Sequence, residues 1–343
     1  MNKVIVVLTA SVIILAVIKS GCNSSPNEHR VVTASDSIPG KTEVAPDMEK
    51  IISNLQNVPT DKLYSRFFDT ARLELIDFPT MLERIKNQQV VYVGETHNNE
   101  SHHQLQLNIL KEIHKHNSQV AVGMEFLYRP QEKDLNRYSR EQSLSDEELK
   151  TMVAAGFGDV YPMYVPILKF ARDNRLIIKG LNVSRGLKKK MTEVGWDNLT
   201  DGEKKLIARD IDTSNQAHRE FVLKAFQNGM MKMGVMPESM MDKFYLSQCV
   251  WDETMAESVA NYFKEVNNPS AQMIVIAGNG HIKYKFNIPE RAAKRYQLTY
   301  KTLIPCEIND SQSLTNEMLD LTMGDFIFFS PPAPPEEEKM MGR

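Results

Sequence analysis

The sequence predicts an α/β protein with a mostly parallel central sheet flanked by helices. Short apolar runs that end in glycine or polar residues alternate with helix-prone segments, a pattern typical of βαβ units. The four clearest runs are Gln89–Gly94, Val120–Met124, Leu176–Leu181 and Met273–Ala277. The chain has 343 residues, of which 42% are hydrophobic and 25% are charged, so it suits one large domain with insertions or two domains.

The first 22 residues predict an export signal. The apolar run Val4–Ile18 rises about 22 Å as a helix, which is short of the ~30 Å hydrocarbon core of a bilayer. Small residues before Cys22 resemble a bacterial lipobox, in which the chain is cleaved before the cysteine and the cysteine is acylated. Lys19 departs from this pattern, because leucine is usual at its position. A plain secretory signal or an uncleaved anchor is the alternative, and on each of these interpretations the protein is exported.

Composition divides the rest of the chain. Residues 23–66 form a predicted tether and N-terminal segment, rich in Ser, Asn, Pro and Thr as far as about Pro46. The α/β domain is expected over residues 67–330, and residues 331–343 are expected to form a disordered tail. Two polar, helix-prone stretches, about 130–160 and 196–264, predict helical insertions that cover the carboxyl ends of the strands.

The helix expected after the first strand reaches about Lys115 and takes its N-cap from Asn98, Asn99 or Ser101. A second helix covers Tyr164–Arg172. Two later runs, Leu298–Ile304 and Asp325–Phe329, are expected to add strands at one edge of the sheet.

Charge and motifs exclude several function classes. The chain carries 44 acidic and 41 basic side chains and a net charge of −3, which argues against a nucleic-acid partner. It contains no HExxH, Gly-x-Ser-x-Gly or P-loop motif, which excludes the common zincin, serine-hydrolase and kinase types. Cys249 and Cys306 lack CxxC spacing, so zinc or thioredoxin-like chemistry has no support.

Polar side chains follow all four of the clearest strands. Glu95 and His97 follow the first, Glu125 the second, Asn182 the third and His281 the fourth. In an open α/β sheet, ligands bind in the crevice outside the carboxyl ends of the strands. The sequence therefore predicts that two carboxylates, two imidazoles and a carboxamide converge on one cleft.

The same residues resemble the ChaN-like family of iron-regulated, haem-binding lipoproteins. The matching segments are Val91–His103 (VYVGETHNNESHH), Gly123–Glu125, Tyr164–Arg172, Gly180–Asn182, Gln248–Ala256, Ala277–His281 and Ile288–Arg291. The resemblance spans about residues 70–330. Asn98 replaces the aspartate that is usual in the family, and the region around Met230–Met241 is atypical of it.

The resemblance implies haem binding at the cell envelope and is compatible with a homodimer that holds haem between its subunits. Haem needs a flat apolar slot, an axial ligand and partners for its propionates. The candidate axial ligands are Tyr164, His97 and His281, and His102 or Arg172 could meet a propionate. Asn182 and Asp252, which lies on a predicted helix, are further candidates for ligand contacts. The region around Met230–Met241 is rich in methionine, which favours a pliable apolar lid over ligation of copper or iron.

The wider superfamily, with erythromycin-esterase and TraB-type groups, implies hydrolysis instead. His97 or His281 could act as general base, Glu95 or Glu125 could orient it, and the Asn182 amide could steady an oxyanion. Alternatively, the same two histidines and two carboxylates form a set suited to a divalent metal ion. The sequence thus favours an envelope lipoprotein, anchored at Cys22, that binds haem or another apolar small molecule. A metal-dependent or His/Glu hydrolase in the same cleft is the alternative.

Overall fold

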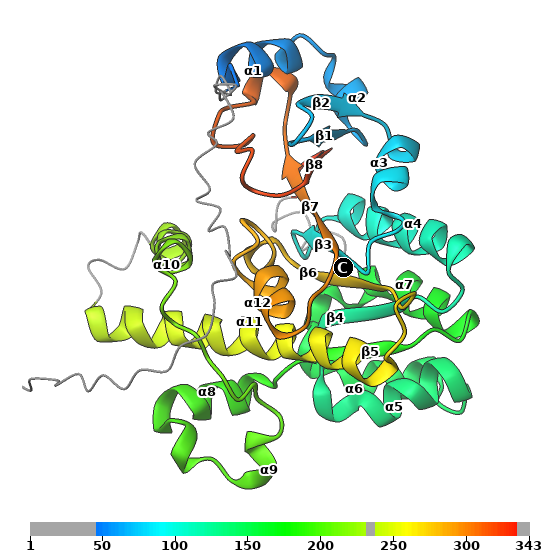
Figure 1. Cartoon of the computed structure of the whole chain (residues 1–343), viewed down its shortest axis with the longest axis vertical. Helices are drawn as coiled ribbons and strands as arrows, with labels where there is room; N and C mark the ends of the chain where they lie inside the picture. The colour runs from blue at the N-terminus through cyan, green and yellow to red at the C-terminus, as the bar shows by residue number, and fades with distance from the viewer. Residues whose placement is uncertain (1–45, 231–236, 335–343) are drawn as a thin grey trace, which may run out of the picture. The chain divides into compact units, whose positions relative to one another are not determined.

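The structure is a computed structural model that describes residues 46–230 and 237–334. The predicted signal peptide with Cys22, the tether up to residue 45, Met231–Met236 and the tail from residue 335 lie outside the described residues. The described part is an eight-stranded sheet with helices on both faces (Figure 1). In this part of the chain, no helix combines the length and apolar character needed to cross a bilayer.

The strand order is β2-β1-β8-β7-β3-β6-β4-β5. The strands are β1 (Phe67–Asp69), β2 (Glu74–Ile76), β3 (Val90–Glu95), β4 (Ala121–Tyr128), β5 (Ile178–Asn182), β6 (Met273–Gly278), β7 (Tyr300–Glu307) and β8 (Phe326–Ser330). From β8 to β5 all neighbours are parallel, whereas β1 is antiparallel to both β8 and β2. This confirms the predicted mostly parallel sheet.

One part of the predicted order is wrong. The two late strands, β7 and β8, were expected at an edge, but β7 pairs with β3 and β8 pairs with β1 inside the sheet. The edge on their side of the sheet is formed by the β1–β2 hairpin, which was not predicted from the sequence; β5 forms the other edge. Each of its strands has only three residues, too few to show a period-two pattern.

Helices cover both faces of the sheet. They are α1 (Met48–Gln56), α2 (Thr60–Leu63), α3 (Phe78–Ile85), α4 (Glu100–His116), α5 (Glu132–Asn136), α6 (Asp146–Phe157), α7 (Tyr161–Asp173), α8 (Arg185–Val194), α9 (Asp201–Lys204), α10 (Gln216–Met230), α11 (Glu238–Val266) and α12 (Ile288–Arg295). The side chain of Asn99 caps α4 by accepting a hydrogen bond from Ser101 N, as one of the predicted caps.

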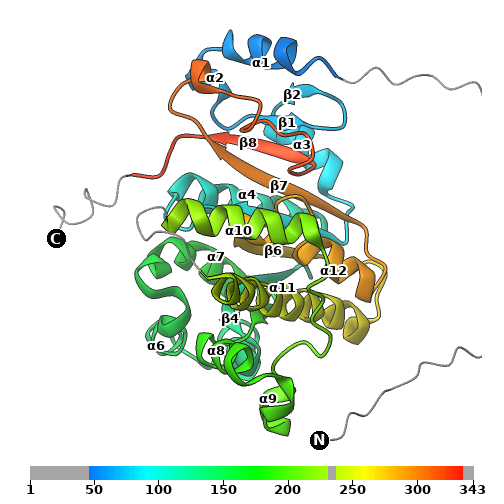
Figure 2. The same ribbon diagram turned by 90° about the vertical axis from the view of Figure 1, so that its left-hand side faces the viewer.

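The two faces of β3 explain the layers. Val91 and Val93 belong to a core shared with α3, α4, α6 and α7, while Val90 and Tyr92 belong to a core shared with α11 and α12. Figures 1 and 2 show the helices arranged around the sheet. Both faces are apolar because a parallel sheet is covered on both sides. The strand therefore appears in the sequence as a continuous apolar run.

The folded unit also includes residues that composition assigned to the N-terminal segment. It begins at Asp47, and α1 and α2 pack Ile52, Leu55 and Leu63 against a core that includes Phe329 of β8. The predicted insertions are helical, but the later half of α11 is part of the main core. Its apolar residues are buried in the core on one face of the sheet, so this part of α11 acts as a crossover helix before β6: they are Met255, Ala256, Val259, Tyr262 and Phe263.

A bulge in β4 places its polar residue. The pairing of β4 with β5 shifts between Met124 and Tyr128, which face Gly180 and Asn182. Glu125 lies within this irregular stretch, and bulges commonly re-aim a side chain toward a site. The bulge brings Tyr128 O within 2.4 Å of where a Cβ on Gly180 would lie, so only glycine fits there.

We expect Gly180→Ala to destabilise the fold by about 1–3 kcal/mol, because the added methyl group meets the backbone of the bulge. Gly186→Ala is the matched control, since it lies in α8 with no atom within 4 Å of the new Cβ. The control should be neutral or stabilising by up to about 1 kcal/mol. Urea unfolding measures both, and equal midpoints for the two variants would contradict this account.

Candidate functional site

The carboxyl ends of the central strands bring the predicted residues together. Glu95 ends β3, Glu125 lies in the β4 bulge and Asn182 ends β5. His281 lies in the short 3-10 turn Asn279–His281 directly after β6. His97 follows β3, and its ring passes so close to Gly278 that a Cβ there would lie 2.7 Å from His97 Cε1.

Glu95 is the centre of a buried hydrogen-bonded group. Its carboxylate accepts hydrogen bonds from His97 Nδ1 at 2.8 Å, from Gln106 Nε2 at 2.7 Å and from the Tyr164 hydroxyl. The His103 ring lies beside Tyr164, with 4.4 Å between centroids. Burial alone raises the pKa of Glu95, but the hydrogen bond from His97 and the nearby His103 outweigh it, so the pKa is lowered.

The contact with Glu95 orients His97. An ionised carboxylate only accepts hydrogen bonds, so Nδ1 of His97 donates and Nε2 is left with a lone pair when the ring is neutral. Within the described residues, no hydrogen bond engages Nε2, and 44% of the side chain is exposed. The ring rests against Phe126, with 4.8 Å between centroids.

His281 forms a bridge between two buried carboxylates, here named the His281 bridge. Its Nδ1 lies 2.6 Å from Asp252 Oδ1, and its Nε2 lies 3.4 Å from Glu125 Oε1. The other oxygen of Glu125 accepts a hydrogen bond from Gly278 N at 2.7 Å. Asp252 comes from α11, so the bridge joins α11, the turn after β6 and β4.

Charge pairing, acting against burial, sets the ionisation of the bridge. Burial alone would lower the pKa of His281, but the two carboxylates raise it to about 10. Burial alone would raise the pKa of Glu125 and of Asp252, but the His281 charge contributes most to lowering each to about 2. All three groups are therefore charged at neutral pH.

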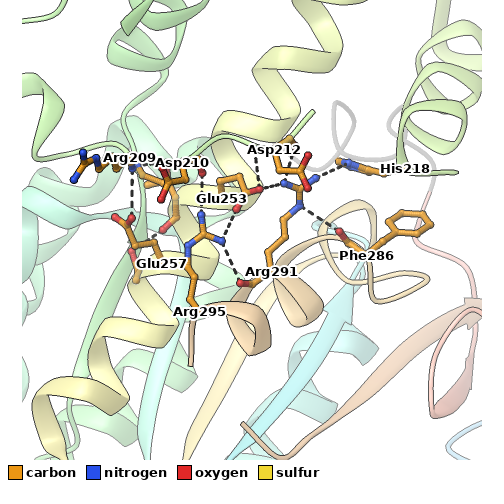
Figure 3. Close-up of polar contacts among 12 residues, drawn as sticks. Arg209, Asp210, Asp212, His218, Glu253, Glu257, Phe286, Arg291 and Arg295 are labelled. Atoms are coloured by element: carbon orange, nitrogen blue, oxygen red, sulfur yellow. Dashed lines mark hydrogen bonds and ion pairs between the residues drawn. The ribbon is translucent and has the colours of Figure 1, made fainter. Parts of the chain in front are cut away.

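The network continues behind Asp252 into α10 and α12. Asp252 Oδ2 lies 3.3 Å from His218 Nε2, and the guanidinium of Arg291 donates to His218 Nδ1 at 3.1 Å. Arg291 also contacts Glu253, and Arg295 Nη1 lies 2.5 Å from the other Glu253 oxygen (Figure 3). These buried pairs hold α10 and α12 against α11.

A small cavity of about 20 Å³ opens beside Glu125. It is lined by Glu125, Phe126, Tyr128, Gly156, Asn182, Val183, Arg185 and Trp251. A volume of this size holds about one water molecule. A large flat ligand would therefore contact the cavity only at its mouth, where Phe126, Tyr128 and Trp251 are each partly exposed.

Several predicted residues lie elsewhere or are inaccessible. Arg172 is near the end of α7, about 12 Å along the helix from Tyr164, and pairs with Asp146 at 3.0 Å. Arg172 therefore does not face the cleft, contrary to the prediction. His102 is fully buried between Thr96 N and Ser330 Oγ, and burial lowers its pKa to about 4. Tyr164 reaches Glu95 but is fully buried.

Sequence reasoning missed four residues of the network. His103 and Gln106 lie one and four positions after His102 on α4, and it is they, not His102, that face Glu95. His218 lies on α10, in a stretch interpreted as an insertion, and no motif marked it. Arg291 was visible in the matched segment Ile288–Arg291, but its role depended on the fold.

The described residues contain no group of three or more His, Cys, Asp or Glu placed to hold a metal ion. The divalent-metal alternative to haem therefore has no support. The imidazole–carboxylate contacts pair the groups with one another: Glu95 with His97, and His281 with Asp252. Among these paired groups, only Nε2 of His97 has no hydrogen-bond partner within the described residues, and 44% of the His97 side chain is exposed.

Residues 81–292, more than half of the chain, match the family described as "Haem-binding uptake, Tiki superfamily, ChaN". The chain is also similar to the structure "Cofacial heme binding to ChaN of Campylobacter jejuni", with 17% identity over 79% of this chain and 96% of that chain and a TM-score of 0.60. At that identity, the likeness shows the fold.

Weaker structural matches include an erythromycin esterase mutant in its open conformation, at 12% identity over 71% of this chain and 77% of that chain, with a TM-score of 0.41. A succinoglycan biosynthesis protein matches at 14% identity over 76% of each chain, also with a TM-score of 0.41. Such scores support no argument about function. Comparison with curated proteins gives no match.

The His281 bridge predicts a stability maximum between pH 4.5 and 6.5. Folding raises the pKa of His281 from 6.5 to about 10, so its contribution is complete below pH 6.5 and is lost as the pH rises toward 10. Folding lowers the pKa values of Glu125 and Asp252 from 4.5 and 3.8 to about 2, so their contribution is complete above pH 4.5 and is lost on acidification toward pH 2. Urea unfolding across this range measures the profile.

Asp252→Asn tests the source of that profile. It should cost about 3 kcal/mol at pH 6 and flatten the decline above pH 6.5, because His281 loses one of its two carboxylate partners. Asp61→Asn removes the same charge at an exposed position and should change neither quantity. An unchanged slope above pH 6.5 in Asp252→Asn would rule out the bridge as its cause.

Proposed function

The chain belongs to the family of haem-binding uptake proteins in the Tiki superfamily that includes ChaN, and from this premise we propose that it binds haem through His97. Bound haem supplies an iron with a coordination position for one protein nitrogen. The imidazole of His97 would fill that position with Nε2, and its ring packs against Phe126, one of the residues that line the cavity beside Glu125. We infer no chemical step beyond binding.

The accessibility of His97 carries this proposal. Of the three candidate axial ligands, Tyr164 is fully buried with its hydroxyl on Glu95, and both ring nitrogens of His281 face carboxylates. His97 has its Nδ1 fixed by Glu95 and 44% of its side chain exposed. Metal-ligating histidines commonly donate their other N–H to a carboxylate in this way, which fixes the ring and raises its basicity.

The surroundings of His97 also fit haem. Phe126 contacts the His97 ring. Tyr128 and Trp251 line the same cavity as Phe126, so aromatic surface is available to a porphyrin. The cavity itself, at about 20 Å³, is too small to enclose one. The protein would therefore cover only part of a bound haem, and we propose that a second copy of the chain covers the rest.

The hydrolase alternative loses one of its two candidate general bases, His281, and a direct role for Glu95. A general base must be unprotonated at the working pH, whereas the carboxylates around His281 raise its pKa to about 10. Glu95 is occupied by Gln106, Tyr164 and His97 and has no free oxygen directed at a substrate. Binding, rather than hydrolysis, is the function that this arrangement favours.

We further propose that the protein is exported and anchored to the bacterial cell envelope through a lipid on Cys22. The apolar run Val4–Ile18 and the small residues before Cys22 support this proposal. Haem uptake at the envelope would suit such an anchor, because a tether would let the folded unit reach its ligand outside the membrane.

His97→Ala should weaken haemin binding about 10- to 100-fold and shift the Soret band, because the iron loses its nitrogen ligand. Glu95→Gln should weaken binding less, since it removes only the charge behind the ring. His116→Ala is the control, an exposed histidine at the far end of α4, and should bind as the wild type does. Optical titration of the purified full-length protein measures all three. An unchanged spectrum and affinity in His97→Ala would refute the axial role.

Cys22→Ser should abolish acylation and move the protein from the membrane fraction to the soluble fraction of a bacterial host. Labelled palmitate and cell fractionation measure the two effects. Labelling that persists in the variant would show that the lipid is attached at another residue and would contradict this proposal.

A further inference from the structure

Two cations of α8 stand at the mouth of the cavity without acidic partners. Arg185 lines the cavity together with Glu125, Tyr128 and Trp251. Lys188 Nζ lies 3.1 Å from the centroid of the Trp251 ring, which holds the ammonium over the same aromatic surface. Within the described residues, neither side chain forms an ion pair or a hydrogen bond with a carboxylate.

The other two lysines of α8 behave differently. Lys189 lies 3.7 Å from Glu193, and Lys190 lies 2.8 Å from Glu203. Neither lines the cavity, and both pair with carboxylates at the surface. The unpaired state of Arg185 and Lys188 is therefore a property of their position at the mouth, and not of the helix as a whole.

The positive charges of Arg185 and Lys188 also repel one another. Residues three apart share one face of a helix, where like charges repel. Burial, followed by the nearby Arg185 charge, lowers the pKa of Lys188 to about 8, although Glu125 acts in the opposite direction. Lys188 is still mostly protonated at neutral pH. An anion at the mouth would relieve this repulsion.

The acidic groups of the site are already engaged elsewhere. Glu125 faces His281 and accepts a hydrogen bond from Gly278 N, and Asp252 pairs with His281 and His218. Glu95 is bound by its own donors behind His97. None of these carboxylates is positioned as a direct partner of Arg185 or Lys188.

We propose that Arg185 and Lys188 together form an anion-binding pair that recognises carboxylate groups on the ligand at the mouth. On this assignment, the site selects flat aromatic molecules that carry acidic side groups, and for haem the pair would bind the propionates. The inference rests on the proposed function for the identity of the ligand. Beyond the proposed function, it states that the acidic groups of the ligand, and not only the iron, determine how tightly the ligand binds.

A purely structural role makes a different prediction. If the two cations served only to offset the buried charge of Glu125, ligands with free acids and ligands with esterified acids would bind alike. Protoporphyrin IX and its dimethyl ester separate the two roles, since they differ only in charge and in the two methyl groups. Both lack iron, so an axial bond to His97 does not contribute.

The experiment titrates the full-length protein with each metal-free porphyrin and follows quenching of tryptophan fluorescence. The wild type should bind the diacid about tenfold more tightly than the diester. Added salt should weaken binding of the diacid but not that of the diester. Arg185→Gln and Lys188→Gln should each remove most of this preference, because each weakens binding of the diacid more than binding of the diester.

Lys189→Gln is the matched control, because it removes the same charge from the same helix at a position that pairs with Glu193. It should keep the wild-type preference. Equal binding of diacid and diester by the wild type, together with His97-dependent binding of haemin, would overturn this inference and leave the proposed function standing. If no porphyrin binds, with or without iron, both proposals fail.

Discussion

The His281 bridge is the constraint on which the site depends. A buried imidazolium between Glu125 and Asp252 is stable only if both carboxylates are held at the right distance, because an unpaired buried charge is costly. The bridge therefore fixes the bulge of β4, the turn after β6 and the middle of α11 relative to one another. Behind it, His218 and the Arg291–Glu253 pair extend the same constraint to α10 and α12.

This interior network leaves the outward-facing chemistry to other residues. Glu95 holds His97 through its Nδ1, and 44% of the His97 side chain is exposed. Arg185 lines the cavity beside Glu125 and Lys188 lies over Trp251 of that cavity, and neither has an acidic partner within the described residues. The buried groups satisfy one another, so the accessible nitrogen and the two cations are what a ligand meets. A binding function follows more naturally from this division than a catalytic one.

The small volume of the cavity is consistent with that view. A volume of roughly 20 Å³ beside Glu125 cannot enclose a porphyrin, so on the proposed function a porphyrin would lie at the surface, against aromatic side chains that are only partly exposed. Such a site gains affinity from a few directed contacts rather than from enclosure, since most of the ligand stays outside the fold. The orientation of His97 and the charge at the mouth of the cavity then matter more than the apolar area buried.

The sequence by itself determined two features. One is the mostly parallel sheet, and the other is the convergence of polar residues at the carboxyl ends of its strands: Glu95, His97, Glu125, Asn182 and His281. Apolar runs and the polar residues that follow them are local signals, and parallel topology carries them to a common place. Accessibility was decided only by the tertiary structure. Tyr164 and His102 are buried because α4 and α7 pack against the sheet, and Arg172 points away because α7 runs past the cleft.

The roles of His218, Arg291 and the α8 cations likewise depended on packing between elements distant in sequence. Spacing along a chain cannot show which of two neighbouring histidines on a helix faces a carboxylate, because they lie about 100° apart around the helix axis and the sequence alone does not determine how the helix is rotated against the sheet. His103 faces Glu95 and His102 does not. Contacts across the core fix that rotation, and those contacts exist only in the folded protein.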